Sequence, residues 1–251
     1  MSREHLAAAV DAHVAGVVDE LTTPHLRDEQ RLQQAARGGF GGLAGSGAAA
    51  GGETDSLWPQ LAARLPRLAE LVASVAAAEA EAAATLLARA ERDHQALGAR
   101  FDDGRDPGPL TAIALGLSDP HNGRQSVAVL TFASGLRVIC KPRSVAMEAG
   151  LATTAAWLRA RTDLDLPPLP AVLERDGYGW CELIEPRACA DAAEVTLHYR
   201  RLGALAGLLG ALGATDCHAE NFVARGSQPL LVDAETLLHP RMLASPGFTL
   251  R

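Results

Sequence analysis

The chain has 251 residues, a formal net charge of −7 at pH 7 and a pI near 5.6. Apolar residues make up 48% of it, enough for a sizeable core, but aromatic residues are only 4%, so aliphatic helix faces should do most of the packing. Binding to a nucleic-acid backbone needs a clustered excess of cations, which this acidic chain lacks. The composition therefore predicts a helix-rich globular protein whose main partner is not nucleic acid.

The four cysteines have no spacing suited to a zinc site and are interpreted as buried thiols in a reducing cytoplasm: Cys140, Cys181, Cys189 and Cys217. Acidic residues interrupt the apolar positions near the N-terminus, which argues against a signal peptide. The longest apolar run, around residues 204–214, is too short to cross a bilayer. We therefore expect a cytoplasmic protein without a transmembrane segment.

The first predicted element is a short amphipathic helix. Apolar positions from Leu6 to Leu21 recur at helical spacing, and Thr22-Thr23-Pro24 then breaks the pattern. This helix belongs to a predicted N-terminal helical segment, residues 1–37. Residues 38–54 are rich in glycine and alanine and are predicted to be a linker.

The remainder, residues 55–251, is predicted to be one domain, with long helices first and β-strands after them. One or two long helices start near Pro59 and run to about Arg100, with a Glu/Arg-rich face that we expect to be solvated. A β-hairpin follows, with strands at 126–133 and 136–141. Lys141 therefore projects from the end of a strand.

The later elements alternate between helices and short strands. The sequence predicts a helix at 148–161, strands at 169–173 and 180–184, a helix at 197–212 that Gly213 ends, and a buried strand at 229–232. A loop from Thr215 to Asn221 follows the second of these helices, and Asp233 follows the last strand.

The order of these features is the order in which kinases place their ATP-binding groups. Asp216 and Asn221 are five residues apart, the interval between the aspartate and asparagine of the protein-kinase catalytic loop. Oxygen ligands from Asn221 and Asp233 suit magnesium, and Lys141 suits contact with phosphates. Taken singly, each has another interpretation: Asp216 as a loop residue, His218 as a structural histidine, Asp233 as a helix cap.

Five segments together resemble the dehydratase domain of class II lanthipeptide synthetases, the LanM type: Ser118–Arg124, Cys140–Arg143, Tyr178–Glu182, Thr215–Asn221 and Val232–Thr236. The resemblance covers roughly residues 55–240. It implies an α+β, helix-rich, lipid-kinase-like fold, with a small antiparallel sheet as the N-lobe and the start of a helical C-lobe. It also implies that serine and threonine of a ribosomally synthesised precursor peptide are phosphorylated with ATP and Mg²⁺, and that phosphate is then eliminated to leave dehydroamino acids.

The resemblance also implies roles for individual residues. The catalytic set is Asp216, His218, Asp119 and His121, of which the last two are linked to elimination. The metal-binding set is Asn221, Asp233 and Glu235, and Lys141 contacts phosphates.

Residue chemistry adds three further candidates to the ATP-binding set. Arg143 and Arg124 can complete an anion pocket with Lys141, and Glu148 is the expected ion-pair partner of Lys141, unless it faces solvent. Elimination needs a base and a cation, types that His121 and Arg124 supply, although His121 also fits a plain turn-stabilising role. Residues 180–182 are expected to mark the hinge that meets adenine, with Trp180 itself in the core.

The chain ends 18 residues after Asp233, so the resemblance predicts an incomplete domain: a fragment, a split gene product or a decayed copy. A C-terminal lobe or cyclase partner would then be supplied separately. Two other functions stay open. One is a small-molecule or lipid-type kinase, and the other is a non-catalytic, pseudokinase-like module that binds a peptide or a partner subunit.

Overall fold

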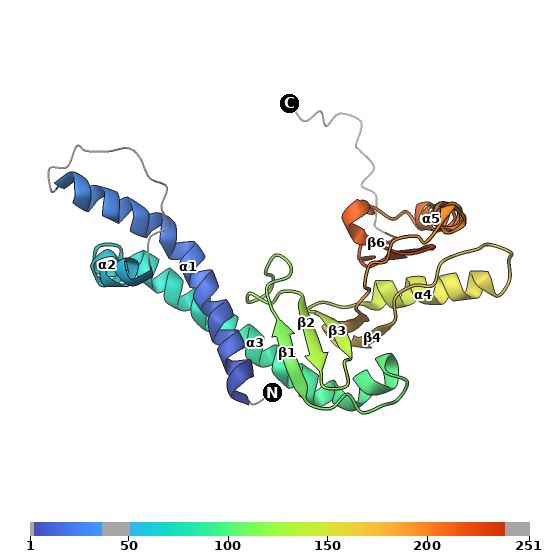
Figure 1. Ribbon diagram of the computed structural model, residues 1–251, viewed down its shortest axis with the longest axis horizontal. Helices are drawn as coiled ribbons and strands as arrows, with labels where there is room; N and C mark the ends of the chain where they lie inside the picture. Colours follow the sequence, from blue (N-terminus) through green and yellow to red (C-terminus); the bar gives the residue numbers. More distant parts are fainter. Residues whose placement is uncertain (1–2, 37–50, 239–251) are drawn as a thin grey trace, which may run out of the picture. The chain divides into compact units, whose positions relative to one another are not determined.

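The computed structural model describes residues 3–36 and 51–238 (Figure 1). They form two compact units, and each is described by itself. The first unit comprises Met1–Asp93 and Thr111–Ala128, and the second comprises His94–Leu110 and Val129–Arg251.

The described residues combine α-helices with antiparallel strands that follow one another along the chain, as in the α+β class. The α-helices are α1 (Arg3–Ala36), α2 (Gly51–Arg64), α3 (Pro66–Phe101), α4 (Ala146–Arg159) and α5 (Ala192–Ala211). The strands are β1 (Leu110–Ala114), β2 (Ala128–Phe132), β3 (Arg137–Lys141), β4 (Val172–Arg175), β5 (Tyr178–Glu182), β6 (Phe222–Arg225) and β7 (Gln228–Leu231).

The strands form two sheets. Five of them lie in the order β1-β2-β3-β5-β4, in which β3 and β4 both pair antiparallel with β5, while β6 and β7 form a separate antiparallel hairpin. The predicted hairpin of β2 and β3 is confirmed, as is the small antiparallel sheet. Two strands were not predicted, β1 and β6, which are only five and four residues long.

In the first unit, α1 continues past the point where the sequence predicted its end. Pro24 lies inside the helix, where it removes one intrahelical hydrogen bond. Beyond it, Leu26 is buried, and buried Glu29 pairs with Arg64 of α2 at 2.5 Å. Figure 1 shows α2 beside this part of α1. Packing on α2 therefore stabilises the extension, and the prediction of a short helix was wrong.

The predicted linker comprises residues 38–54. Its residues 38–50 lie outside the described part of the chain, and residues 51–54 form the start of α2. The predicted long helices are confirmed as α2 and α3. Their Glu/Arg-rich face is exposed as expected at Glu70, Glu81 and Glu91, whereas two acidic residues on the apolar stripe of α3, Glu79 and Asp93, are buried. By length and composition α3 could also cross a membrane, with 22% of its most apolar window buried. That composition is shared by alanine-rich helices of soluble proteins, and Glu79 is ion-paired within the first unit.

In the second unit, a close approach at Gly179 brings α4 onto the sheet. Gly179 of β5 lies opposite Lys141 of β3. A Cβ atom at Gly179 would lie 2.2 Å from Val145 Cγ2, and Val145, which is fully buried, directly precedes α4. Only glycine leaves room for this contact. It places Glu148, in the first turn of α4, against the end of β3.

An aliphatic cluster joins α4, α5 and the segment after β7. Its buried members are Leu151, Leu205, Leu209, Leu231, Ala234 and Leu237. Figure 1 shows α5 beside the β6–β7 hairpin, in agreement with these contacts. Because Leu231 and Ala234 are both anchored in the cluster, Asp233 between them is held at its edge.

The sequence correctly placed the end of α5 at Gly213. Gly213 has φ +62°, and its N–H donates to the carbonyl of Gly210 at 3.1 Å. The N–H of Ala214 donates to the carbonyl of Leu209 at 2.9 Å, which completes a Schellman motif. The chain therefore leaves the helix sharply and enters the loop that carries Asp216.

All four cysteines are free. Cys140 and Cys181 are buried as predicted, whereas Cys189 and Cys217 are partly exposed, so the prediction of four buried thiols holds for two. The Sγ atoms of Cys189 and Cys217 each lie near a backbone carbonyl, of Gly226 at 3.3 Å and of Thr215 at 3.5 Å.

Candidate functional site

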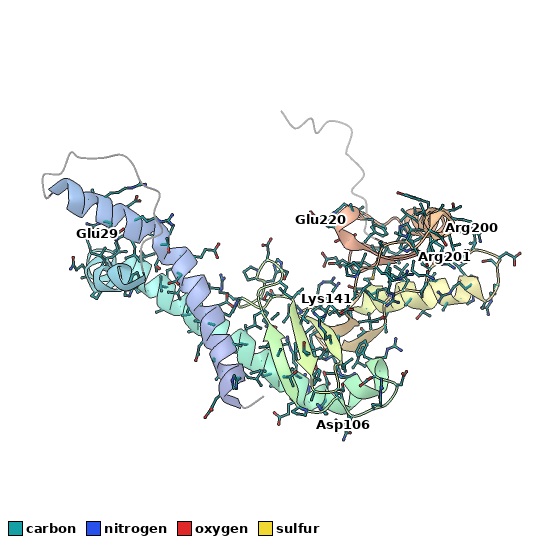
Figure 2. All side chains as sticks on the ribbon, viewed as in Figure 1. Glu29, Asp106, Lys141, Arg200, Arg201 and Glu220 are labelled. Carbon is teal, nitrogen blue, oxygen red and sulfur yellow. The ribbon has the colours of Figure 1, made fainter. Side chains whose placement is uncertain are left out.

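A buried ion pair lies where β3 meets α4, and Figure 2 labels Lys141 at this end of the strand. Lys141 Nζ lies 3.2 Å from Glu148 Oε1 and 3.3 Å from Asp233 Oδ1, and it donates to the carbonyl of Val232 at 2.9 Å. The side chains of Lys141 and Glu148 are 7% and 9% exposed. The expected pairing of these two residues is therefore present, and the solvent-facing alternative for Glu148 is wrong.

Arg143, two residues beyond Lys141, binds three carboxylates. Its Nη2 donates to Glu148 Oε1 at 2.9 Å and to Asp233 Oδ1 at 2.5 Å, and its Nε lies 2.9 Å from Glu235 Oε2. Burial alone would lower the pKa of Arg143, but the neighbouring carboxylates, Glu148 above all, outweigh this and raise it. The guanidinium therefore stays charged at any pH at which the fold persists.

The loop after α5 is tied to the segment that carries Asp233. Thr215 N–H donates to the carbonyl of Thr236 at 3.2 Å, and Thr236 Oγ1 donates back to the carbonyl of Thr215. At the other end of the loop, Val232 N–H donates to the carbonyl of Asn221 at 2.9 Å. The two predicted site segments, 215–221 and 232–236, therefore lie side by side.

Asp216 has an unusual backbone conformation, with φ +55°. Aspartate tolerates this left-handed region better than most residues, but at a cost. The Asn221 amide nitrogen donates to the carbonyl of Asp216 at 2.8 Å, which stabilises the turn and directs the Asn221 side-chain oxygen away from it. Strained backbone of this kind clusters at functional sites.

His218 is half exposed and lies near two acidic side chains. Its Nε2 is 3.4 Å from Asp216 Oδ1, and its Nδ1 is 3.9 Å from Glu220 Oε2. Exposed pairs of this kind contribute little to stability. His218 is thus not a core residue, and each of its ring nitrogens has an exposed acidic side chain nearby.

The donor set around Asp233 has the chemistry that magnesium prefers. Asp233 and Glu235 supply carboxylates that a single cation, Arg143, already draws together, and Asn221 supplies an amide oxygen. Within the described ranges, no three His, Cys, Asp or Glu side chains gather closely enough to hold a metal by themselves. The residues fit a cation that keeps several waters and shares ligands with a nucleotide, rather than a metal in an all-protein cage.

The predicted hinge lies beside a small apolar pocket of about 20 Å³, which holds about one water molecule. Glu148, Cys181 and Glu182 are among its lining residues. Glu182 itself accepts hydrogen bonds from Arg225 and from the N–H of Ala171. Trp180 is fully buried, as expected for a core residue.

Asp119, His121 and Arg124 lie in the first unit, whereas Lys141 and Arg143 lie in the second. The backbone of His121 pairs in both directions with that of Gln125, at 2.9 and 2.8 Å, which confirms a tight turn. Asp119 and Arg124 line a pocket of about 480 Å³ together with residues of α1 and α3. Its volume lies in the range of small-molecule sites.

Arg124 owes its position to a buried carboxylate that the sequence analysis missed. Arg124 has φ +65°, and its Nε donates to Glu79 Oε1 at 2.5 Å. The other oxygen of Glu79 lies 3.1 Å from His13 Nε2. One signal was available: Glu79 continues the helical spacing of the buried residues Val72 and Ala83, so it interrupts an apolar stripe. The Thr215–Thr236 contact had no comparable signal.

The family described as "Domain of unknown function (DUF4135)" matches residues 65–249, so the chain belongs to that family. The Lacticin 481/lactococcin biosynthesis protein LcnDR2 of Lactococcus lactis subsp. lactis is 25% identical over 132 residues. The match covers 49% of this chain and 14% of that protein, so the chain corresponds to a small part of its length. The chain is thus distantly related to a protein of lacticin and lactococcin biosynthesis.

Proposed function

We propose that this DUF4135 chain acts in lanthipeptide biosynthesis, using ATP and Mg²⁺ to phosphorylate serine and threonine of a ribosomally synthesised precursor peptide and then eliminating phosphate. Its fold would be lipid-kinase-like. The relation to LcnDR2, whose name assigns that protein to the biosynthesis of lacticin 481, supports the pathway. We propose the activity, the peptide partner and a cytoplasmic location together with this pathway.

The observation that carries the proposal is the contact of Lys141 with both Glu148 and Asp233. Kinases need a lysine on a strand paired with a glutamate on the next helix, and an aspartate for the metal ion close by. Here the lysine ends β3, the glutamate lies in the first turn of α4 and the aspartate follows β7. Two residues close in the sequence, Lys141 and Glu148, thus meet a third from far along the chain, Asp233, and this contact supports a role in phosphoryl transfer.

In the phosphorylation step, the chain's own residues bind and orient. ATP would supply the phosphoryl group, and magnesium held by Asn221, Asp233 and Glu235 would neutralise its charge. Lys141 contacts the phosphates as a point charge. Asp216, on the exposed strained loop, accepts the proton of the peptide hydroxyl group, and His218 stands beside it.

In the elimination step, a base removes the α-proton of the phosphorylated residue. The electron pair of that C–H bond forms the Cα=Cβ double bond, and the Cβ–O bond breaks with its electrons leaving on inorganic phosphate. We assign the base to His121, assisted by Asp119, and the stabilisation of phosphate to the Arg124 guanidinium. This half of the proposal rests on the resemblance of the segment 118–124 and on the pocket that Asp119 and Arg124 line; His121 is exposed and is not one of the lining residues.

The test of phosphorylation is to incubate the chain with a Ser/Thr-rich precursor peptide, ATP and Mg²⁺ and to measure the peptide mass. We expect gain of phosphoryl groups, or net loss of water if elimination follows. Asp216→Asn should slow phosphorylation by a factor of about 10²–10⁴. Arg137→Gln is the control, because it removes a charge from an exposed ion pair on β3, outside the 215–221 loop.

Elimination is tested separately with a synthetic phosphoserine peptide and no ATP. Release of inorganic phosphate that is lost in His121→Ala supports the assignment. ATP binding without any change in the peptide would contradict the proposal in favour of a pseudokinase-like binding module. Transfer of phosphate to an aminoglycoside or lipid acceptor, but not to peptide, would favour the small-molecule kinase instead.

A further inference from the structure

Arg143 occupies the carboxylates that the proposed function assigns to a metal ion. Through Nη2 and Nε it contacts Asp233 Oδ1 and Glu235 Oε2, and the same Nη2 also donates to Glu148. Its remaining described contact, from Nη1 to the carbonyl of Ser144, is local. The guanidinium is thus held mainly by acidic groups, two of which are candidate metal ligands.

Two cations cannot share these oxygens without cost. Asp233 Oδ1 already lies within 3.3 Å of Lys141 Nζ as well as of Arg143 Nη2. The Arg143 and Asp233 side chains are 29% and 35% exposed, so the repulsion between a guanidinium and a divalent cation is only partly screened by water. Arg143 must therefore loosen its contacts before Asp233 and Glu235 hold a metal ion well.

We propose that Arg143 is an internal competitor for the divalent cation at Asp233 and Glu235, and that a nucleotide relieves this competition by accepting the guanidinium on its phosphates. The proposal rests on the proposed function, since it takes these two carboxylates as metal ligands. The planar guanidinium is well matched to phosphate oxygens, which would compensate for the carboxylate bonds that it loses. Metal and nucleotide then bind cooperatively, and by linkage each tightens the other equally.

The test measures Mn²⁺ binding to the full chain without nucleotide, using the electron paramagnetic resonance signal of free Mn²⁺. Mn²⁺ is the probe because it shares the oxygen ligands of Mg²⁺. We expect Arg143→Gln to bind Mn²⁺ at least about fivefold more tightly than the wild type. Arg143→Lys keeps the charge and should stay near the wild-type affinity, as should Arg137→Gln.

A non-hydrolysable ATP analogue should then tighten Mn²⁺ binding much more in the wild type than in Arg143→Gln. Adding Asp233→Asn to Arg143→Gln should abolish the gain, which locates the metal. Circular dichroism of each variant checks that it is folded, and Arg143→Ala, which also removes the charge and should show the same gain in Mn²⁺ affinity, serves if Arg143→Gln is not.

Equal or weaker Mn²⁺ binding by Arg143→Gln would overturn the proposal, because Arg143 would then organise the carboxylates instead of competing for them. So would an absence of Mn²⁺ binding in every variant, or binding that survives Asp233→Asn. These outcomes are distinct from failure of the proposed function, which the peptide assay of the wild-type chain decides. A gain in Mn²⁺ affinity without peptide phosphorylation would leave this inference standing and refute the function.

Discussion

Val145 packs so closely on Gly179 that a methyl group at position 179 would lie 2.2 Å from Val145 Cγ2. Gly179→Ala should therefore push α4 away from the sheet. Overpacking of this kind costs about 1–3 kcal/mol, and the expected loss in free energy of unfolding is in this range. Chemical denaturation of the full chain measures it.

Gly207→Ala is the matched control for this substitution, because nothing lies within 4 Å of the Cβ that it adds to α5. It should leave stability unchanged or raise it by about 0.5–1 kcal/mol, since alanine favours helix. Val145→Ala combined with Gly179→Ala should recover part of the loss. No recovery would mean that the contact with Val145 is not the cause.

Lys141→Met should destabilise the chain and remove nucleotide binding. Glu148 keeps Arg143 as a partner, so the cost should fall near the lower end of the roughly 3–5 kcal/mol seen when one partner of a buried pair is removed. Arg137→Gln breaks an ion pair with Glu185 in which the two side chains are 47% and 74% exposed. It should lower the free energy of unfolding by less than about 1 kcal/mol. Thermal melts and ATP titration measure both effects. Similar losses in the two variants would contradict the contrast between the buried and exposed pairs.

Alkaline pH should weaken the fold through Cys181. Burial raises the pKa of this thiol from 9.0 to about 11, with Lys141 partly opposing the shift. The native state then holds its proton between these values while the unfolded chain releases it, so stability falls as pH rises from about 9 to 11. Two pKa units correspond to about 3 kcal/mol.

Cys181→Ala should remove this alkaline component, and Cys189→Ser, at a partly exposed thiol, should not. Urea unfolding at a series of pH values gives the slopes. A wild-type slope equal to that of Cys181→Ala between pH 9 and 11 would rule out the buried thiol as its origin.

In the first unit, Glu79→Gln should lower the free energy of unfolding, because it removes the charge that pairs with Arg124 and His13 in the lining of the 480 Å³ pocket. A hydrogen bond to a charged group contributes about 1.5–3 kcal/mol, and we expect a loss of that size. A double-mutant cycle with Arg124→Gln isolates the pair, and a coupling energy near zero would show that it contributes nothing. If Arg124 assists elimination, the same variant should also slow phosphate release from the phosphoserine peptide.

Local signals predicted the parts of the site that depend on neighbouring residues in the chain. Gly213 ends α5 because a left-handed residue is needed there, and the period-two pattern of β3 placed Lys141 at a strand end. Glu148 was the expected partner of Lys141, with a solvent-facing position as the alternative, and the two side chains lie 3.2 Å apart. The assigned roles of these residues remain predictions, although their positions agree with them.

Contacts between residues far apart in the sequence could not be predicted from local sequence patterns. Arg143 and Asp233 are 90 residues apart, and no local rule joins them. The extension of α1 beyond Pro24 depends on Glu29 meeting Arg64 of another helix, which outweighs the local preference to break. Strands β1 and β6 have no buried residue, so they lack the alternation of buried and less buried positions that β2 shows.

The paired hydrogen bonds between Thr215 and Thr236 close the backbone into a ring whose ends are 21 residues apart. Asp216 and Asp233 both lie on this ring, just inside its junction. Their separation is therefore fixed by one short piece of chain, independently of the five-stranded sheet. If the sheet shifts to admit a ligand, these two aspartates should travel as a single body, and the gap that changes should be the one to Lys141.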